Sequence, residues 1–179
     1  MKLFSPTQVL HKYQDWSFVD PDVLDARSEE GILVHEYAKN YASGLWAPIR
    51  GDVLGYCLSF RNWFSKYVSQ VFAVEKELED DDLGIICHID LIGRLTGDKN
   101  GDLSIIDYKT GLTTGRTWQS QVAVYIHIAN KNGFAVKRGG DLKLKKNGGV
   151  AQYIPCDTKG QDLAAFISAL NAHRFYLGD

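Results

Sequence analysis

The chain has 179 residues, with 20 lysines and arginines against 22 aspartates and glutamates and a formal net charge of −2 at pH 7. Its content of 45% hydrophobic and 12% aromatic residues is typical of folded globular proteins and excludes a disordered chain. The charge excludes a histone-like protein but leaves room for nucleic acid bound through a local patch. No apolar run approaches the roughly 18 residues of a membrane span, and the first residues lack the apolar stretch of a secretory signal. Without repeats or linkers, the sequence predicts one domain over residues 1–179 and no membrane partner.

The cysteine pattern indicates a reducing compartment. Cys57, Cys87 and Cys156 are isolated and odd in number, so neither a disulfide framework nor a C-x-x-C metal site is encoded. We therefore expect the chain to act in the cytoplasm.

Hydrophobic periodicity predicts two helices, a three-strand meander, a helix, a basic hairpin and a final helix. The first helix is expected at 28–44, where Ser28 suits the start and Gly44 the end. The second, at 55–71, carries an aromatic stripe that we assign to the core rather than to a base-stacking platform. The remaining elements are expected as strands at 72–78, 83–95 and 103–108, a helix at 117–130, a hairpin around 143–149 and a helix at 160–175. This order favours an α/β fold with one mixed sheet and helices packed on it.

Two acids and a lysine form the most informative pattern. Asp107 and Lys109 alternate along a strand and therefore point to one face, whereas Tyr108 points to the other. If the two strands are hairpin neighbours, Asp90 lies beside Asp107. Converging carboxylates repel each other unless a cation lies between them, and such oxygen ligands suit Mg²⁺ or Mn²⁺. A lysine there adds positive charge where a water and a phosphate oxygen would lie, so the pattern fits phosphodiester hydrolysis.

The context of the D-x-K triplet decides between a site and an ordinary strand. Alone, such a triplet is most often an exposed strand face. Here Asp107 and Lys109 end an apolar strand that exits into Thr110-Gly111, which favours a site held on a rigid element.

Three further side chains can join this site. Gln121 and Tyr125, spaced i, i+4, stand on one helix face, and their helix follows soon after Lys109. The alternative is that Tyr125 belongs to the core and Gln121 to its boundary. His35 is expected on the flank of the first helix, where a boundary histidine is the commoner role.

Together these residues resemble the PD-(D/E)XK nuclease superfamily, specifically its RecB-like and phage-exonuclease branch. Each motif is weak alone, but five in the family's order are specific. The motifs are Gly31-x-x-x-His35, Glu75-x-x-Leu78, His88-Ile89-Asp90-Leu91-Ile92, Ile106-Asp107-Tyr108-Lys109-Thr110 and Gln121-x-x-x-Tyr125. Phage-encoded members are also similar at two further segments, Ser5-Pro6-Thr7-Gln8-Val9-Leu10 and Leu142-Lys143-Leu144-Lys145-Lys146-Asn147-Gly148.

The resemblance implies a Mg²⁺- or Mn²⁺-dependent DNA nuclease with a restriction-endonuclease-like αβββαβ core. That core is a mixed central sheet flanked by helices, here with an added basic β-hairpin and a C-terminal helix. By analogy, Asp90, Asp107 and the carbonyl of Tyr108 ligate the metal, and Lys109 positions or activates the attacking water. His35 matches an additional metal ligand of RecB-like members.

The resemblance also gives supporting roles. Gln121 and Tyr125 match a helix pair that supports the lysine and the phosphate. Glu75 matches an acid on the strand before Asp90, with Glu77 as the alternative because the strand register is not fixed by sequence. The two glutamates are expected to share a face.

The departures from the family pattern leave the metal ligands and the lysine in place. Cys87 replaces a glycine three residues before Asp90, and Ile89 stands where the family has its proline. Strand alternation puts His88 and Ile92 on the face of Asp90, so His88 is either close to the metal or a bystander. Members with an iron–sulfur cluster use four cysteines, so we expect no iron–sulfur cluster here.

DNA binding requires a positive surface, and the charges are unevenly distributed. Between residues 131 and 146, six basic residues accompany one acid, Asp141, a local charge of +5. Residues 75–82 hold six acids and one lysine, a local charge of −5, and are expected to face away from DNA. The hairpin lysines are expected to contact the DNA backbone, with simple solvation as the alternative. These lysines are Lys143, Lys145 and Lys146.

A further phosphate contact is expected at Arg116, near the start of the Gln121 helix, where the helix N-terminus favours anions.

Our leading hypothesis is an exonuclease of phage or prophage type, acting in recombination or repair in a bacterial or phage-infected cell. The resemblance leaves room for a single-strand annealing partner and a ring-shaped homo-oligomer. The alternatives are a structure-selective endonuclease and a non-catalytic nucleic-acid-binding module on a decayed nuclease fold. Decay generally removes Asp90, Asp107 or Lys109, and all three are present.

Overall fold

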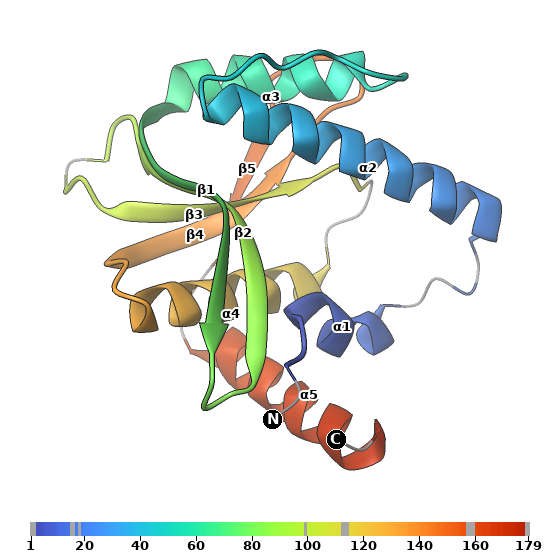
Figure 1. The fold of residues 1–179 in the computed structure, drawn as a ribbon, viewed down its shortest axis with the longest axis vertical. Coiled ribbons are helices and arrows are strands. Elements are labelled where there is room, and N and C mark those ends of the chain that lie inside the picture. The colour runs from blue at the N-terminus through green and yellow to red at the C-terminus, as the bar shows by residue number, and fades with distance from the viewer. Residues whose placement is uncertain are drawn as a thin grey trace.

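A five-stranded mixed sheet forms the centre of the computed structural model (Figure 1). The strands lie in chain order; β3 and β4 run parallel, and every other neighbouring pair is antiparallel. Their bounds are β1 Val68–Asp80, β2 Ile85–Leu95, β3 Leu103–Lys109, β4 Val136–Lys143 and β5 Gln152–Pro155. The structure describes residues 3–14, 17, 19–98, 100–111, 115–156 and 160–177. The predicted α/β class with a mixed sheet is confirmed.

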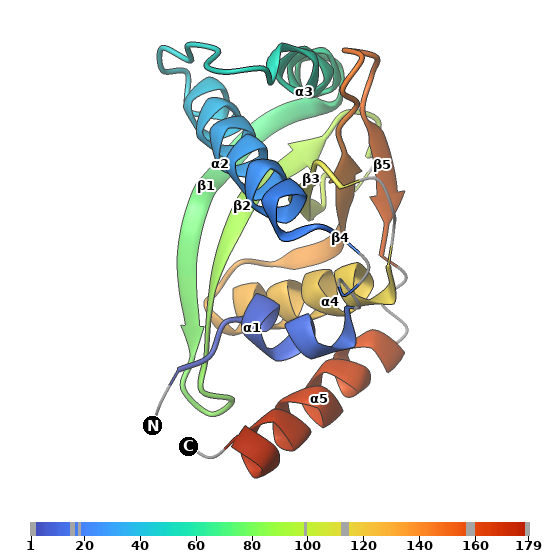
Figure 2. The same ribbon diagram turned by 90° about the vertical axis from the view of Figure 1, so that its right-hand side faces the viewer.

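Helices lie on both sides of this sheet (Figure 2). On one side are α2 (Pro21–Ala42) and α3 (Leu54–Tyr67), and on the other are α1 (Pro6–Leu10), α4 (Arg116–Lys131) and α5 (Gln161–Leu177). A 3₁₀ turn, His11–Tyr13, follows α1. The order from α3 through β4 is the expected αβββαβ, with β5 and α5 added. None of the helices in the described residues is long and apolar enough to cross a membrane.

Two helix boundaries differ most from the prediction. Helix α2 begins at Pro21 rather than Ser28, because Asp20 caps it by accepting a hydrogen bond from the Asp22 amide at 2.9 Å. Helix α3 ends at Tyr67, four residues early, because the chain turns extended at Val68 and pairs with Leu95 of β2. The aromatic spacing masked this change, since bulky residues suit both structures.

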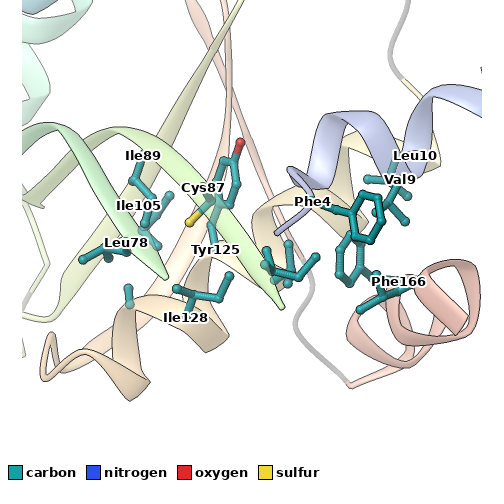
Figure 3. Close-up of a cluster of buried hydrophobic side chains, with 14 of the residues drawn as sticks. Phe4, Val9, Leu10, Leu78, Cys87, Ile89, Ile105, Tyr125, Ile128 and Phe166 are labelled. Carbon is teal, nitrogen blue, oxygen red and sulfur yellow. The ribbon is translucent and has the colours of Figure 1, made fainter. Parts of the chain in front are cut away.

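Two hydrophobic clusters fill the spaces between the layers. One packs Ile89 and Ile105 of the sheet against Ile128 of α4 and Phe166 of α5 (Figure 3). The other lies under α2 and α3 and contains the three fully buried aromatic residues of α3. These are Tyr56, Phe60 and Trp63, each at most 3% exposed. The assignment of this stripe to the core is therefore confirmed.

The N-terminal segment is fixed beside α4. Phe4 pairs with Ile85 of β2 and, with Val9 and Leu10, packs near Phe166 (Figure 3). Ser5 caps α1 in a reciprocal arrangement with Gln8. This anchoring brings α1 to the end of the sheet where the predicted site residues gather.

The three cysteines lie apart in the fold. All are buried, and each belongs to a different hydrophobic cluster. Burial raises the pKa of Cys57 to about 11 and that of Cys87 to about 12, so these thiols stay protonated at neutral pH.

Candidate active site

The sheet brings Asp90 and Asp107 together. Strands β2 and β3 pair as far as Leu91 and Ile106, and the two acids are the next residues along each strand. One Asp90 oxygen accepts a hydrogen bond from the Tyr108 amide at 2.6 Å. Both carboxylates are nearly buried, at 6% and 4% exposure. Hairpin pairing thus places them side by side, as the sequence predicted.

The strand alternation is broken at Glu75 and Asp90. Glu75 has a φ of 47°, in the left-handed region that side chains seldom adopt. On β2, Ile89 and Ile92 pack in the same cluster whereas Leu91 packs in the other. The prediction that Asp90 shares a face with Ile92 was therefore wrong, because it assumed an unbroken period of two.

The two glutamates differ in burial. Glu75 lies near Asp90 and is half-buried, whereas Glu77 pairs at the surface with His88 at 2.8 Å. His88 and Glu77 side chains are 60% and 56% exposed. Both glutamates lie opposite the sheet face that carries Leu78, as the sequence predicted, because the break in alternation lies between Val74 and Glu75. His88 is a bystander in this structure.

His35 of α2 faces these acids. Its Nδ1 lies 3.2 Å from Asp90 Oδ1 and 4.0 Å from Glu75 Oε1. Burial lowers the pKa of His35, but the charge and hydrogen bond of Asp90, with Asp107 and Glu75, raise it to about 9. Burial and the charge of Asp90 raise the pKa of Glu75. The cluster thus concentrates negative charge around one imidazole.

This cluster fits a divalent cation. One ligand atom from each of His35, Glu75 and Asp90 lies within 4.8 Å of the others. Glu75 Oε1 is buried and accepts no hydrogen bond within the described part of the chain, a costly state for a carboxylate. An imidazole nitrogen with carboxylate oxygens forms a donor set for Mg²⁺- or Mn²⁺-type ions. Such an ion would neutralise the acids and polarise a phosphate oxygen.

Lys109 is held at the centre of a polar chain. Its Nζ lies 2.5 Å from Asp107 Oδ2 and donates to Gln121 Oε1 at 2.8 Å. The Gln121 amide donates in turn to the Tyr125 hydroxyl at 2.7 Å and to the Thr7 hydroxyl at 3.5 Å. Burial lowers the pKa of Lys109, but Asp107 raises it more, so the ammonium stays charged.

Tyr125 is both a core residue and a neighbour of the site. Its ring is 5% exposed and packs in the core, while its hydroxyl accepts the Gln121 hydrogen bond. The Tyr108 side chain, by contrast, packs against Phe60 on the other face of the sheet.

Sequence reasoning missed three residues around Lys109. Thr7 reaches the site from α1, and the Trp118 ring lies 5.4 Å from the lysine Nζ. Asp141, counted above among solvated charges, is 1% exposed and pairs in register with Asp107. Burial and then the charge of Asp107 raise the pKa of Asp141 to about 7, against the opposing effect of Lys109. The alternation of Asp141 with Leu142 on a strand was the available signal.

The predicted DNA contacts are dispersed. Arg116 is exposed at the first residue of α4, and Lys145 is exposed beyond β4. Lys143 lies in register beside Lys109 on the sheet. The Lys146 ammonium pairs with Glu30 of α2 at 3.0 Å.

The stretch 131–146 is not one solvated basic face. Lys131 binds Asp80 and Asp82 of the acidic turn, and Arg138 pairs with Asp98 at 3.1 Å. The local charge of +5 therefore overstated the positive surface, because the acids that pair with these basic residues lie far from them in the sequence.

Comparison with models of protein families identifies the family of this chain. Residues 20–172 match the family model of the PD-(D/E)XK nuclease superfamily. The chain belongs to this superfamily. A comparison with curated proteins finds no match. Members of the superfamily are metal-dependent nucleases, and the matched range contains the His35, Glu75 and Asp90 cluster, a candidate acidic metal site.

Proposed function

We propose that this chain is a Mg²⁺- or Mn²⁺-dependent DNA exonuclease. The observation that carries the proposal is the convergence of three metal-ligand atoms within 4.8 Å beside one further acid, Asp107, and a charged lysine. Asp90 and Asp107, with the Tyr108 carbonyl and His35, would hold the cation, and Glu75 would support them. A cation at these oxygens relieves the repulsion among buried carboxylates and draws a phosphodiester to the same place.

Lys109 supplies the second half of the chemistry. Its ammonium is held on one side by Asp107 and on another by Gln121. A fixed positive charge in a water-poor site stabilises the charge that develops on the reacting phosphate. Gln121, supported by Tyr125 and Thr7, would keep the lysine aimed at the attacking water.

Exonuclease activity and a phage-type role are supported by the similarity of two segments. The Ser5–Leu10 segment is similar to phage-encoded members, and its Thr7 contacts Gln121 in this fold. The hairpin after α4 is similar to the same members. On this basis we propose action in recombination or repair in the cytoplasm of a bacterial or phage-infected cell, with a single-strand annealing protein as partner and a homo-oligomer as the working form.

DNA would approach from the side on which α1 and the start of α4 lie. Arg116 is placed to contact a phosphate at the α4 N-terminus, and Lys143 and Lys145 to contact the backbone beyond β4. Charges of this kind make binding salt-dependent.

The test is cleavage of matched DNA forms. Purified protein is incubated with circular and linear DNA, single- and double-stranded, in Mg²⁺, Mn²⁺ or EDTA, with Asp107→Ala as the control. Metal-dependent loss of linear DNA alone, absent from the variant, supports the exonuclease. Cutting of circles would identify an endonuclease, and DNA binding without any cleavage would identify a non-catalytic binding module.

A further inference from the structure

Asp141 of β4 is a buried acid beside the proposed site that the functions above leave unused. It lies in parallel register with Asp107, so both side chains point to the α4 face of the sheet. Only 1% of Asp141 is exposed, and its Oδ1 finds no hydrogen-bond donor within the described residues. An ionised carboxylate buried in this way is costly unless a cation reaches it.

The surroundings leave few candidates for that cation. Helix α4 covers β4 so closely that a Cβ at Gly139 would lie 2.6 Å from Val122. The neighbouring acid, Asp107, is already paired with the Lys109 ammonium at 2.5 Å. Asp141 also acts on Lys109 through space, as the second carboxylate after Asp107 that raises the pKa of the lysine. The Lys109 ammonium therefore interacts electrostatically with two acids on adjacent strands.

The pairing of Lys109 with Asp107 creates a conflict for the proposed chemistry. Asp107 is also a proposed metal ligand, and a carboxylate oxygen that accepts from an ammonium is less available to a cation. Coordination by Asp107 thus requires that Lys109 loosen its ion pair. A charged lysine without a counter-ion in a nearly buried site would then be unstable.

We propose that Asp141 is a positioning residue that receives the Lys109 ammonium when Asp107 engages a divalent metal. The lysine then keeps its charge and stays fixed between Asp141 and Gln121. This inference rests on the proposed function, because it assigns Asp107 to the metal. In the metal-bound protein Asp141 then has a counter-ion, so only the metal-free protein bears the cost of burying this carboxylate unpaired.

A double-mutant cycle on metal affinity tests this role without relying on cleavage. The variants are Asp141→Asn, which removes the charge and keeps the shape, Lys109→Met, which keeps the length and removes the ammonium, and their combination. Mn²⁺ affinity is measured by calorimetry, and the thermal unfolding of each metal-free variant is recorded. Asp141→Asn should weaken Mn²⁺ binding about tenfold, the order of one charge-assisted hydrogen bond. In the Lys109→Met background, the same substitution should weaken it less than about twofold.

Other outcomes overturn the proposal. Equal weakening in both backgrounds would show that Asp141 acts on the metal directly. Unchanged Mn²⁺ affinity of the single variant Asp141→Asn, which retains Lys109, would show that Asp141 has no part in metal binding. A merely structural role would lower the unfolding temperature of metal-free Asp141→Asn and leave metal affinity unchanged.

A second measurement needs no variant. In a crystal of the unaltered protein grown with Ca²⁺, which occupies oxygen sites, Lys109 Nζ should lie within hydrogen-bond distance of Asp141, and a lysine still paired with Asp107 would refute the transfer. These readouts separate the two proposals. Normal cleavage with an inert Asp141→Asn sinks this inference alone, whereas the predicted cycle without DNA cleavage sinks the proposed function alone.

Discussion

Binding of a divalent cation should release a proton from His35 and tighten as the pH rises. In the metal-free protein, burial lowers the pKa of His35, but Asp90, with Asp107 and Glu75, raises that pKa to about 9. Only the neutral imidazole coordinates a metal. Between about pH 7 and pH 8, almost every His35 ring must therefore lose its proton on binding, and affinity should rise about tenfold per pH unit before levelling off near pH 9.

Calorimetry with Mn²⁺ in two buffers of different ionisation enthalpy measures this release directly. At about pH 8, Asp141, with its pKa of about 7, is already mostly ionised and contributes little. Wild-type protein should then release about one proton per ion, and His35→Gln, which has no titrating ring, should release much less. Wild-type binding without proton release, or equal release by the variant, would refute the placement of His35 at the metal.

Three further substitutions test particular contacts. Because Glu75 has a φ of 47°, metal-free Glu75→Gly should be about 1 kcal/mol more stable to thermal unfolding than Glu75→Ala, the reverse of the usual order in a strand; equal stabilities would contradict the left-handed backbone. Asp80→Asn should lose about 2 kcal/mol in urea unfolding at neutral pH, because the buried carboxylate binds Lys131 and His127. Burial raises the pKa of Asp80, but Lys131 and the other partners lower it more. The stability difference between wild type and Asp80→Asn should therefore vanish as the pH falls below the pKa of Asp80. A difference that persists in acid would count against this ion pair. Tyr125→Phe removes only the Gln121 contact and should slow single-turnover cleavage by about tenfold or less; a larger loss than that of Lys109→Ala would reverse the assigned roles.

Local periodicity was enough to find the residues that lie close in sequence. Asp107 and Lys109 share a face because β3 is regular, and Gln121 and Tyr125 share one because α4 is regular. The hydrogen bond from Gln121 to Tyr125 is the i, i+4 contact that the spacing predicts.

The remaining features depend on irregular or distant pairing. Periodicity assumes one backbone conformation, so it could not predict the break at Asp90 beside the left-handed Glu75, which puts Ile92 on the other face. The burial of Asp141 follows from its parallel pairing with β3, a crossover connection through α4 that no local pattern encodes. Thr7 reaches Gln121 across 114 positions in the chain, which only the packing of α1 against the core explains.

We propose that this chain hydrolyses phosphodiester bonds with a divalent metal and Lys109. The most direct test of this proposal is single-turnover cleavage of a labelled linear DNA in Mn²⁺, with Mn²⁺ affinity measured on the same samples, for wild type and Lys109→Ala. We expect metal-dependent cleavage by the wild type and a loss of at least about 10²-fold in the variant, which still binds the metal. Cleavage by the variant at the wild-type rate, or no cleavage by a wild type that binds metal and DNA, would contradict this proposal.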